Sequence, residues 1–469
     1  MANSKNFFPL LTSPIWEKQK QYYEQQGETA WNYVPFLYTS NKFMACWIAD
    51  IIMNLSQTHP DKKIQIIELG SGHGMFSYFL YHRLQSLNVD FSLTVTDLIQ
   101  ANLDYLSALP QWQGLQVNWL QMSQLEELKT ISGFDGVNFV IANYFFDSLP
   151  NDGYELVGDD WQKAYLLTKN KKNQSEGFVD IDLSFISKPC QLLDEDEKLL
   201  NRYKGIADHV LIPTAVKEIM HIFHESTNPS YFFVNDKGFL DINQMNYGDN
   251  YAYNCDGAMS TMVNFDAIKY WAEDFFDGFL IANDNDHDGS HFMIFSINSL
   301  GQQQQNLVKM ALSGASWNMI FKLFMVFEEQ PEMSFDDVSF YVQSSRYDEA
   351  MLSRISGYVF NQIKEEGSLI NQLKPMLNKI METFYWHPAR MMYYFTMIDL
   401  FTLCGEYQKS QNLINQYKHL VHSQYDILLR EGVILYKMQQ HDLAIEKFNK
   451  ALKINSKCQE SRRYLELLA

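Results

Sequence analysis

Several features are scarce in this chain of 469 residues, and each scarcity excludes a class of protein. The cysteines are too far apart to form a CxxC pair, which argues against a disulfide framework or a zinc site and favours a reducing compartment; they are Cys46, Cys190, Cys255, Cys404 and Cys458. The N-terminus has no apolar run of secretory length. The longest apolar stretch, residues 319–327, is interrupted by Lys322, and a bilayer span needs about 20 apolar residues. We therefore expect a cytoplasmic protein with no bound metal and no membrane association.

Basic residues are also few. The chain has 37 lysines and arginines against 56 aspartates and glutamates, which gives a formal net charge of −19. Such a charge repels phosphate backbones, so we expect no nucleic-acid partner. Hydrophobic residues make up 46% of the chain and aromatic residues 15%, which predicts well-packed cores.

Strand-like and helix-like segments alternate between residues 63 and 146. Residues 64–69, 91–96 and 139–143 are short apolar runs typical of buried strands, and residues 75–87 show helical spacing. This alternation predicts parallel strands joined by crossover helices, hence an α/β, Rossmann-like fold. Three later runs should complete the sheet, at residues 231–234, 278–282 and 291–297. The charged, periodic segment at about 190–226 is predicted to be a helical insertion.

The pattern changes near residue 300, where strand signals almost disappear. We expect one domain over residues 1–300, a polar linker that includes Gln302 to Gln305, and an all-helical domain over residues 306–469. Within the second domain, Ser410 and Ala444 occupy equivalent positions 34 residues apart, the period of a tetratricopeptide repeat. The last unit has the small and aromatic residues that let two helices pack closely: Gly432, Ala444, Phe448 and Ala451. A plain helical bundle is the alternative, and either would bind a protein substrate, a protein partner or a second copy of the chain.

A glycine-rich turn follows the first strand. Gly70, Gly72 and Gly74 come directly after Glu68-Leu69 and before the predicted helix, where a tight turn exposes backbone N–H groups to a ligand. The dinucleotide fingerprint needs G-x-G-x-x-G, whereas this run is G-x-G-x-G. With Glu68 before it, the turn resembles that of class I S-adenosylmethionine methyltransferases, in which the acidic residue lies near the amino-acid end of the cofactor.

An acidic residue at the end of the second strand provides an independent test of that resemblance. Asp97 follows the run FSLTVT, where the family would bind the ribose hydroxyls. Ligands of such sheets lie at the carboxyl ends of the strands, so Gly70, Asp97 and Asn143 should converge there. Gln121 and Met122 are further candidates for cofactor binding. The alternative is an unrelated α/β fold that happens to have a tight turn.

The segment from Asn143 to Pro150 narrows the resemblance. With residues 68–74 it is similar to the MidA family, methyltransferases linked to complex I assembly and to protein arginine methylation, in which this motif reads N-E-x-x-D-A-L-P. Further similar segments are residues 32–39, 134–137, 234–238 and 262–265. The resemblance spans about residues 20–298 and implies S-adenosyl-L-methionine as cofactor. The predicted all-helical domain lies outside the resemblance.

The resemblance implies roles for several residues. Asn143, Tyr144 and Asp147 are the catalytic candidates, and Phe146 and Asp236 the substrate-binding ones. Phe145 and Phe146 could instead simply pack against the sheet. This sequence departs from the family's motifs in two places. Tyr144 stands where the family has a glutamate after the asparagine, and Met-Val-Asn-Phe stands where the family has H-V-D-F. Asp147, Asp236 and Asp256 remain as partners for a guanidinium, which needs carboxylates.

Two functions are consistent with these motifs. The first is S-adenosylmethionine-dependent methyl transfer to a protein side-chain nitrogen, with arginine as the acceptor by resemblance. The alternative is a cofactor-binding protein that has lost catalysis and acts as an interaction module through its helical repeats. The substitutions at Tyr144, Met262 and Asn264 are compatible with either.

Overall fold

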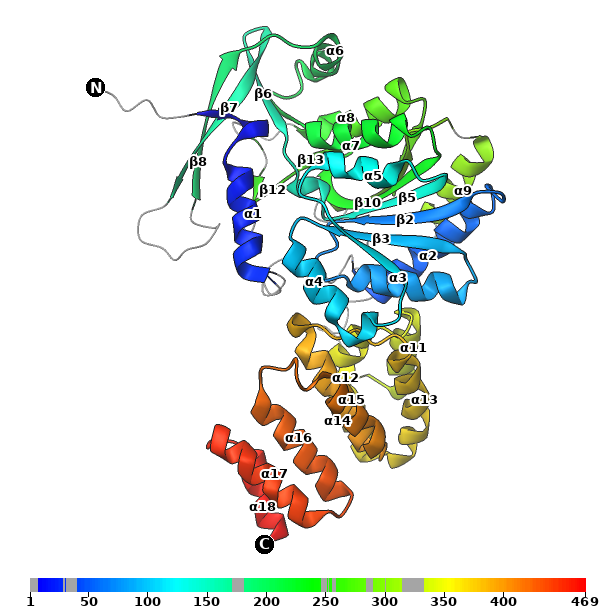
Figure 1. The fold of residues 1–469 in the computed structure, drawn as a ribbon, viewed down its shortest axis with the longest axis vertical. Coiled ribbons are helices and arrows are strands. Elements are labelled where there is room, and N and C mark those ends of the chain that lie inside the picture. Colours follow the sequence, from blue (N-terminus) through cyan, green and yellow to red (C-terminus); the bar gives the residue numbers. More distant parts are fainter. Residues whose placement is uncertain are drawn as a thin grey trace, which may run out of the picture. The chain divides into compact units, whose positions relative to one another are not determined.

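The structure is a computed structural model, and it describes residues 7–27, 30, 40–170, 181–245, 251, 253–254, 259–283, 290–299, 301–313 and 333–469. The chain forms two compact units. The first comprises residues Met1–Ser107 and Gly114–Phe321, and the second comprises Ala108–Gln113 and Lys322–Ala469. Figure 1 shows strands and helices alternating in the first unit and only helices in the C-terminal part.

The first unit is built on an eight-stranded sheet whose main path has the order β14-β15-β10-β5-β2-β3-β4. β2, β3, β4, β5 and β10 run parallel to one another, and β15 runs antiparallel to both β10 and β14. The remaining short strand, β13, pairs with β10. The strands span Lys63–Leu69 (β2), Phe91–Asp97 (β3), Val117–Gln121 (β4), Gly136–Asn143 (β5), Ser230–Phe239 (β10), Val263–Asn264 (β13), Phe279–Ala282 (β14) and Ser290–Ser296 (β15).

This sheet confirms the expected α/β fold. All six strands predicted from apolar runs are present, and the predicted helix at residues 75–87 is α3, Met75–Ser86. The strand order reverses between β2 and β5, because β3 and β4 follow on one side and β10 on the other. In open α/β sheets, ligands bind outside the carboxyl ends of the strands at such a reversal.

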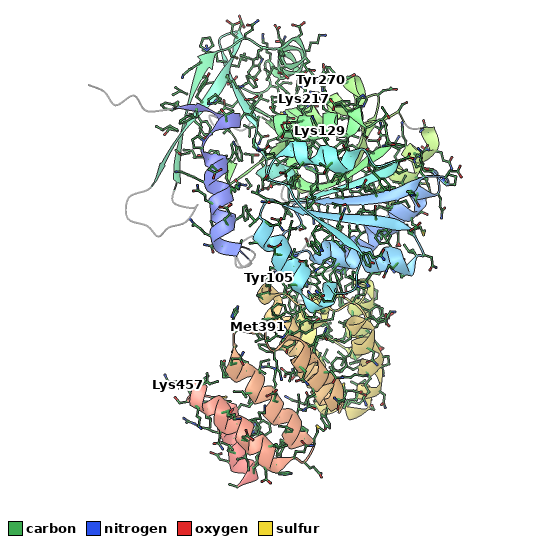
Figure 2. The ribbon with its side chains drawn as sticks, viewed as in Figure 1. Tyr105, Lys129, Lys217, Tyr270, Met391 and Lys457 are labelled. Atoms are coloured by element: carbon green, nitrogen blue, oxygen red, sulfur yellow. The ribbon has the colours of Figure 1, made fainter. Side chains whose placement is uncertain are left out.

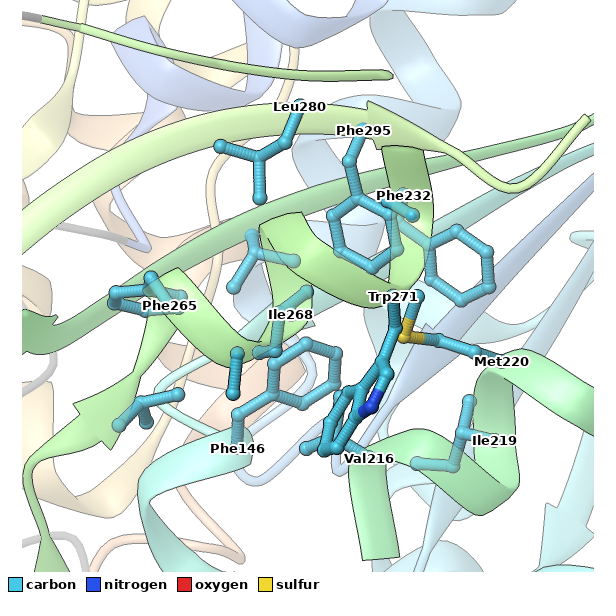
Figure 3. Packing of buried hydrophobic residues seen from close by; sticks show 14 of the residues in the cluster. Phe146, Val216, Ile219, Met220, Phe232, Phe265, Ile268, Trp271, Leu280 and Phe295 are labelled. Carbon is cyan, nitrogen blue, oxygen red and sulfur yellow. The ribbon is translucent and has the colours of Figure 1, made fainter. Parts of the chain in front are cut away.

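Apolar side chains on the two faces of the sheet pack against different helices. Ile67 and Val140 belong to a large core with α7 (Thr214–Glu225) and α8 (Phe265–Tyr270), in which Phe146, Val216 and Trp271 pack closely (Figure 3). The opposite face meets α2 (Lys42–Ser56) and α3, where residues of both layers surround one small hollow; among them are Met44, Ile48, Phe76, Ile141 and Phe233. Strand alternation therefore assigns odd and even residues of β5 to different layers.

A second, antiparallel sheet was not expected from the sequence. Its order is β1-β7-β6-β9, with β8 paired to β7. Its strands span Phe8–Pro9 (β1), Asp152–Val157 (β6), Asp160–Asn170 (β7), Ile181–Pro189 (β8) and His209–Ile212 (β9). The predicted helical insertion at about 190–226 is therefore incorrect in part, because β9 separates α6 (Asp194–Tyr203) from α7 and pairs with β6.

The helices of that region are held together by charge. Lys217 of α7, marked in Figure 2, forms ion pairs with Glu195 and Asp196 of α6, the second at 3.2 Å. Its ammonium also lies 5.2 Å from the ring centre of Trp271. α6 is thereby tied to the core that covers one face of the main sheet.

The predicted polar linker is helical. Gln302 to Gln305 form the first turn of α9 (Gln302–Ser313), which belongs to the first unit and contacts α2 and β14. Val308 and Leu312 are its buried residues, one helical turn apart. Sequence reasoning missed this helix start because four consecutive glutamines resemble a solvated connection.

The second unit is helical throughout its described residues, as expected. Its helices are α11 (Phe335–Ser344), α12 (Glu349–Glu365), α13 (Ile370–Met381), α14 (Met391–Leu403), α15 (Tyr407–Tyr417), α16 (Gln424–Lys437), α17 (His441–Ile454) and α18 (Gln459–Leu468). Met391, where α14 begins, and Lys457, between α17 and α18, are marked in Figure 2.

Two helical hairpins repeat within this unit. Helices α14 and α15 are joined at Gly405, and α16 and α17 at Gln439, two residues that are 34 positions apart and have φ angles of 74° and 60°. Ser410 and Ala444 are both fully buried at equivalent positions of the second helices. The 34-residue spacing of the sequence thus corresponds to repeated helix pairs, while their assignment as tetratricopeptide repeats stays a prediction.

Gly432 should be essential to the last hairpin. A Cβ atom added there would lie 2.6 Å from Cε1 of Phe448, so Gly432→Ala should lower the free energy of unfolding of this unit by about 1–2 kcal/mol despite the better helix propensity of alanine. Gly357→Ala in α12 is the control, because no atom lies within 4 Å of its added Cβ, and it should be neutral or stabilising. Denaturant unfolding measures both, and equal effects would contradict close packing at Gly432.

The described residues contain neither a membrane-spanning helix nor a cluster of metal ligands. No helix in this part of the chain is long and apolar enough to cross a bilayer. Within the same residues, no cluster of three or more histidine, cysteine, aspartate or glutamate side chains has the arrangement of a metal site.

Candidate active site

The glycine turn joins β2 to α3 at the centre of the main sheet. Gly70, Gly72 and Gly74 all have positive φ angles, of 64°, 57° and 70°, which other residues adopt only with strain. Gly70 also needs its small size, because an added Cβ would lie 2.6 Å from Cδ2 of Phe145. The backbone N–H of Ser71 donates to the carbonyl of Thr96 at 2.8 Å, so the turn is fixed to the end of β3.

Glu68 is buried below this turn. Its side chain is 3% exposed and accepts a hydrogen bond from the hydroxyl of Ser77 in α3. Burial raises the pKa of Glu68 to about 8, although the Ser77 hydrogen bond opposes the shift. Glu68 is not among the residues that line the adjoining pocket. Its observed contact instead braces the strand–turn–helix junction.

Asp97 organises the tip of β3. Its carboxylate accepts hydrogen bonds from the backbone N–H of Gly72 at 3.2 Å, from Nδ2 of Asn102 at 2.8 Å and from the N–H of Ile99 at 2.9 Å. Burial raises its pKa to about 6, and these hydrogen bonds limit the shift. The structure therefore brings Asp97 and Gly72 into direct contact, as their predicted shared role requires.

The tip of β4 lies beside Asp97, because Gln121 pairs with Asp97 in the parallel register. The side-chain amide of Gln121 donates to the carbonyl of Leu98 at 3.3 Å, and the N–H of Met122 donates to the carbonyl of Asp97 at 2.8 Å. Met122 lines the pocket described next, whereas Gln121 supports its wall from behind.

One large pocket opens at these strand tips, with a volume of about 640 Å³. That volume lies in the range of small-molecule sites. Gly70, Gly72, Asp97 and Met122 line it together, so the loops after β2, β3 and β4 meet at this pocket. The lining also contains residues that the sequence did not indicate; they include Leu98, Ile99, Ser123, Gln124 and Glu218.

The far wall of the pocket is α1, Ile15–Gln26, another feature that sequence reasoning missed. Trp16, Glu17, Gln19, Lys20 and Tyr23 of this helix line the hollow. The recurrence of these residues every three to four positions was readable as one helix face. Nothing in the sequence indicated which surface that face would meet.

The side chains of Asn143 and Tyr144, at the end of β5, line two different hollows. Nδ2 of Asn143 donates to the hydroxyl of Ser40 at 3.2 Å, and the side chain lines the small hollow on the α2 face of the sheet. Tyr144 has a positive φ of 49° and lines the large pocket. The predicted convergence of Asn143 with Gly70 and Asp97 in one pocket is therefore not observed, and Tyr144 occupies the corresponding place.

Phe145 and Phe146 also lie in different surroundings. Phe145 lines the pocket, whereas Phe146, 1% exposed, packs in the core among residues of α7 and α8 (Figure 3). The prediction that Phe146 contacts the substrate is therefore corrected, and the alternative of simple packing applies to it. The aromatic wall of the pocket comes from Phe145, Tyr144, Tyr23 and Trp16.

Asp147 and Asp236 form a buried acidic pair behind the pocket. Oδ2 of Asp236 accepts from the backbone N–H of Asp147 at 3.1 Å, and the ammonium of Lys237 lies 3.6 Å from Oδ2 of Asp147. Burial raises the pKa of both carboxyls, and the charge of Asp147 adds to the shift of Asp236. Neither lines the pocket, so in this structure they hold the 146–148 turn against β10 rather than facing a ligand.

Three other predictions concern the periphery. Residues 32–39 and Asp256 lie outside the described residues. Asn264, at the altered H-V-D-F motif, caps α8 by accepting from the N–H of Ala267 at 3.0 Å, and its amide donates to the carbonyl of Leu211 at 3.1 Å. This position therefore has a structural role in connecting α8 to β9.

Residues 43–247 match a protein family described as "Putative S-adenosyl-L-methionine-dependent methyltransferase". This match covers the glycine turn, Asp97 and all strands of the main sheet except β13, β14 and β15. This part of the chain is therefore similar to a methyltransferase family. The glycine turn and Asp97 predicted a methyltransferase with S-adenosylmethionine as cofactor. The match confirms this class of enzyme and this cofactor for the first unit, which is called the methyltransferase domain below.

Two crystal structures of proteins from Burkholderia thailandensis are similar to this chain. One is of an uncharacterized protein, with 14% identity over 75% of this chain and 83% of the other and a TM-score of 0.44. The second, described as bound to S-adenosyl-homocysteine, has 13% identity over 75% of this chain and 84% of the other, also with a TM-score of 0.44. The search of curated proteins found no match.

The pocket of the methyltransferase domain fits its cofactor chemically. Oε1 of Gln19, a residue that lines the pocket, is buried and has no hydrogen-bond partner within the described protein residues. Three glycines provide the turn against which an amino-acid group can lie, and Asp97 provides a carboxylate for hydroxyl groups. The cofactor supplies an electrophilic methyl group, and the residues of this chain bind and orient the reactants.

Proposed function

We propose that the methyltransferase domain transfers a methyl group to a protein side-chain nitrogen, with arginine as the preferred acceptor. The supporting observation is that carboxylates and aromatic rings line the same pocket as the strand tips at which the cofactor is expected to bind. Glu17 of α1 and Glu218 of α7 line this pocket, as do Tyr144 and Phe145. Lys20 is the one basic residue among the described lining residues. This charge balance favours a cationic acceptor.

Arginine chemistry explains the choice of carboxylates. A guanidinium stays protonated at physiological pH, so its site must pair it with acidic groups that orient one nitrogen toward the methyl donor. Methyl transfer is an in-line displacement, for which positioning supplies most of the acceleration. Glu17 and Glu218 provide acidic groups in a pocket where the family's glutamate is replaced by Tyr144.

The second unit is proposed to bind the protein that carries the acceptor. Its two repeated hairpins have a tetratricopeptide-like period, and such repeats form extended binding surfaces. A second copy of this chain is the alternative occupant. If the second unit recognises the acceptor protein, methylation of intact acceptor proteins should depend on this unit, whereas methylation of short acceptor peptides should not. Methylation assays with both kinds of acceptor test this role.

The proposal is tested by incubating the purified chain with radiolabelled S-adenosylmethionine and cell lysate, followed by amino-acid analysis of the labelled protein. Label in methylarginine supports the proposal. Label confined to lipid or small molecules contradicts a protein acceptor. Binding of the cofactor with no transfer to any acceptor would favour the interaction-module alternative, and absence of cofactor binding would contradict both.

The carboxylates of Glu17 and Glu218 should contribute to the affinity for the methyl acceptor. Replacing Glu17 and Glu218 together by glutamine should raise the KM for a protein acceptor by about threefold to tenfold, a modest effect because both side chains are exposed to solvent. The affinity for S-adenosyl-homocysteine should not change. Asp135→Asn is the control, since that side chain is 95% exposed and does not line the pocket. An unchanged KM in the double variant would show that these carboxylates do not contribute to acceptor recognition.

A further inference from the structure

Helix α1 precedes the region that matches the methyltransferase family, which begins at residue 43, yet it closes one side of the pocket. Four of its pocket-lining residues, Trp16, Gln19, Lys20 and Tyr23, recur at intervals of three and four positions and so occupy one face of the helix. Gly72 and Asp97 line the same pocket. A ligand bound at the strand tips therefore has α1 as a neighbour.

Gln19 fixes this helix to the β5 loop and leaves one polar atom unused. Its Nε2 donates to the carbonyl of Ser148 at 3.3 Å. Its Oε1 is buried and has no partner within the described residues, and the side chain as a whole is 5% exposed. An unsatisfied buried acceptor costs about 1–3 kcal/mol, so such an atom on a pocket wall indicates a ligand that donates a hydrogen bond.

Tyr23 lies one turn further along the same face and is close to two carboxylates. Burial raises the pKa of its phenol well above the usual value, and the negative charges of Asp147 and Asp97 raise it further. The hydroxyl therefore keeps its proton and remains a hydrogen-bond donor. Asp97, the residue predicted to bind ribose, lines the same pocket as Tyr23.

We propose that α1 is part of the methyl-donor site and that Gln19 and Tyr23 contact the bound donor. Oε1 of Gln19 accepts a hydrogen bond from a hydroxyl or ammonium group of the donor, and the ring of Tyr23 packs against it. The inference rests on the proposed function, because it requires an adenosyl donor at the strand tips. It assigns donor binding to a segment outside the family's matched region.

Calorimetric titration with S-adenosyl-homocysteine, without acceptor, tests this proposal on the full chain. Tyr23→Ala should weaken binding by about tenfold or more, and Gln19→Leu by about twofold to tenfold. Tyr22→Ala is the control, because Tyr22 packs against the small core of Leu10, Ile15 and Leu166 and does not line the pocket; it should bind as the wild type does. Wild-type affinity in both Tyr23→Ala and Gln19→Leu would overturn the proposal, as would a change in acceptor KM alone.

Hydrogen exchange gives a second test that requires no variant. Binding of S-adenosyl-homocysteine to the wild type should slow amide exchange in peptides from Ile15–Gln26 and leave Tyr407–Tyr417 unchanged. Bound ligand with unaltered exchange in α1 would contradict the role of the helix while leaving the proposed function intact. A wild type that does not bind the ligand contradicts the proposed function itself, so the two failures are distinguishable.

Discussion

Gly72→Arg is expected to abolish both binding of S-adenosyl-homocysteine and methyl transfer. Gly72 lines the pocket, has a φ of 57° and donates its N–H to Asp97 at 3.2 Å. An arginine side chain at this position would fill the hollow where the donor is expected to bind and would strain the backbone. We expect no detectable heat of binding in calorimetry and no transfer of radiolabel above background.

The control for this variant is Gly114→Arg. Gly114 also has a positive φ, of 83°, but no atom lies within 4 Å of an added Cβ, and it does not line the pocket. Both variants therefore carry the backbone cost of about 1 kcal/mol, and only Gly72→Arg blocks the site. Thermal unfolding should be similar for the two. Retained donor binding in Gly72→Arg would show that the turn does not contact the donor.

Asp97→Ala should weaken donor binding by about 1–3 kcal/mol, or about fivefold to 150-fold. The carboxylate provides acceptors for ribose hydroxyls, and it also holds Gly72 and Asn102 in place. Asp97→Asn preserves the size of the side chain and one oxygen acceptor, so it should lose less affinity than alanine. Calorimetry with S-adenosyl-homocysteine measures both, and an unchanged Kd would place the ribose elsewhere.

The pH dependence follows from the pKa of Asp97, which burial raises to about 6. The ionised carboxylate is the better hydrogen-bond acceptor, so donor affinity should rise as the pH increases from 5 to 7 and Asp97 loses its proton. Glu68, with a pKa of about 8, remains largely protonated over this range. Asp97→Asn should lose most of the dependence. A variant that keeps the wild-type profile would assign the titration to another group.

Much of the main sheet could be predicted because its strands are continuous apolar runs. Residues 64–69 and 139–142 are buried on both faces, a pattern typical of parallel strands covered by helices on both sides. β7 was missed because it mixes Gln162, Lys163 and Lys169 with apolar residues and contains no long hydrophobic segment. Its pairing with β6 and β8 depends on contacts that a local pattern does not specify.

The site was predicted best where residues follow directly from the ends of strands. Gly70, Gly72 and Asp97 lie there and share one pocket. Asn143 could have been assigned more accurately, because strand alternation places it with Ile141 on the α2 face, opposite to Val140. The contribution of α1 could not be predicted, since it depends on how a separate helix packs against loops distant in sequence.

A crystal structure of the chain with S-adenosyl-homocysteine tests the central claim most directly. The account predicts the ligand in the 640 Å³ pocket, with its ribose at Asp97, its amino-acid end against the turn of Gly70 and Gly72, and Tyr23 in contact with it. Ligand bound elsewhere on the chain, or bound in that pocket with its ribose away from Asp97, would contradict the account.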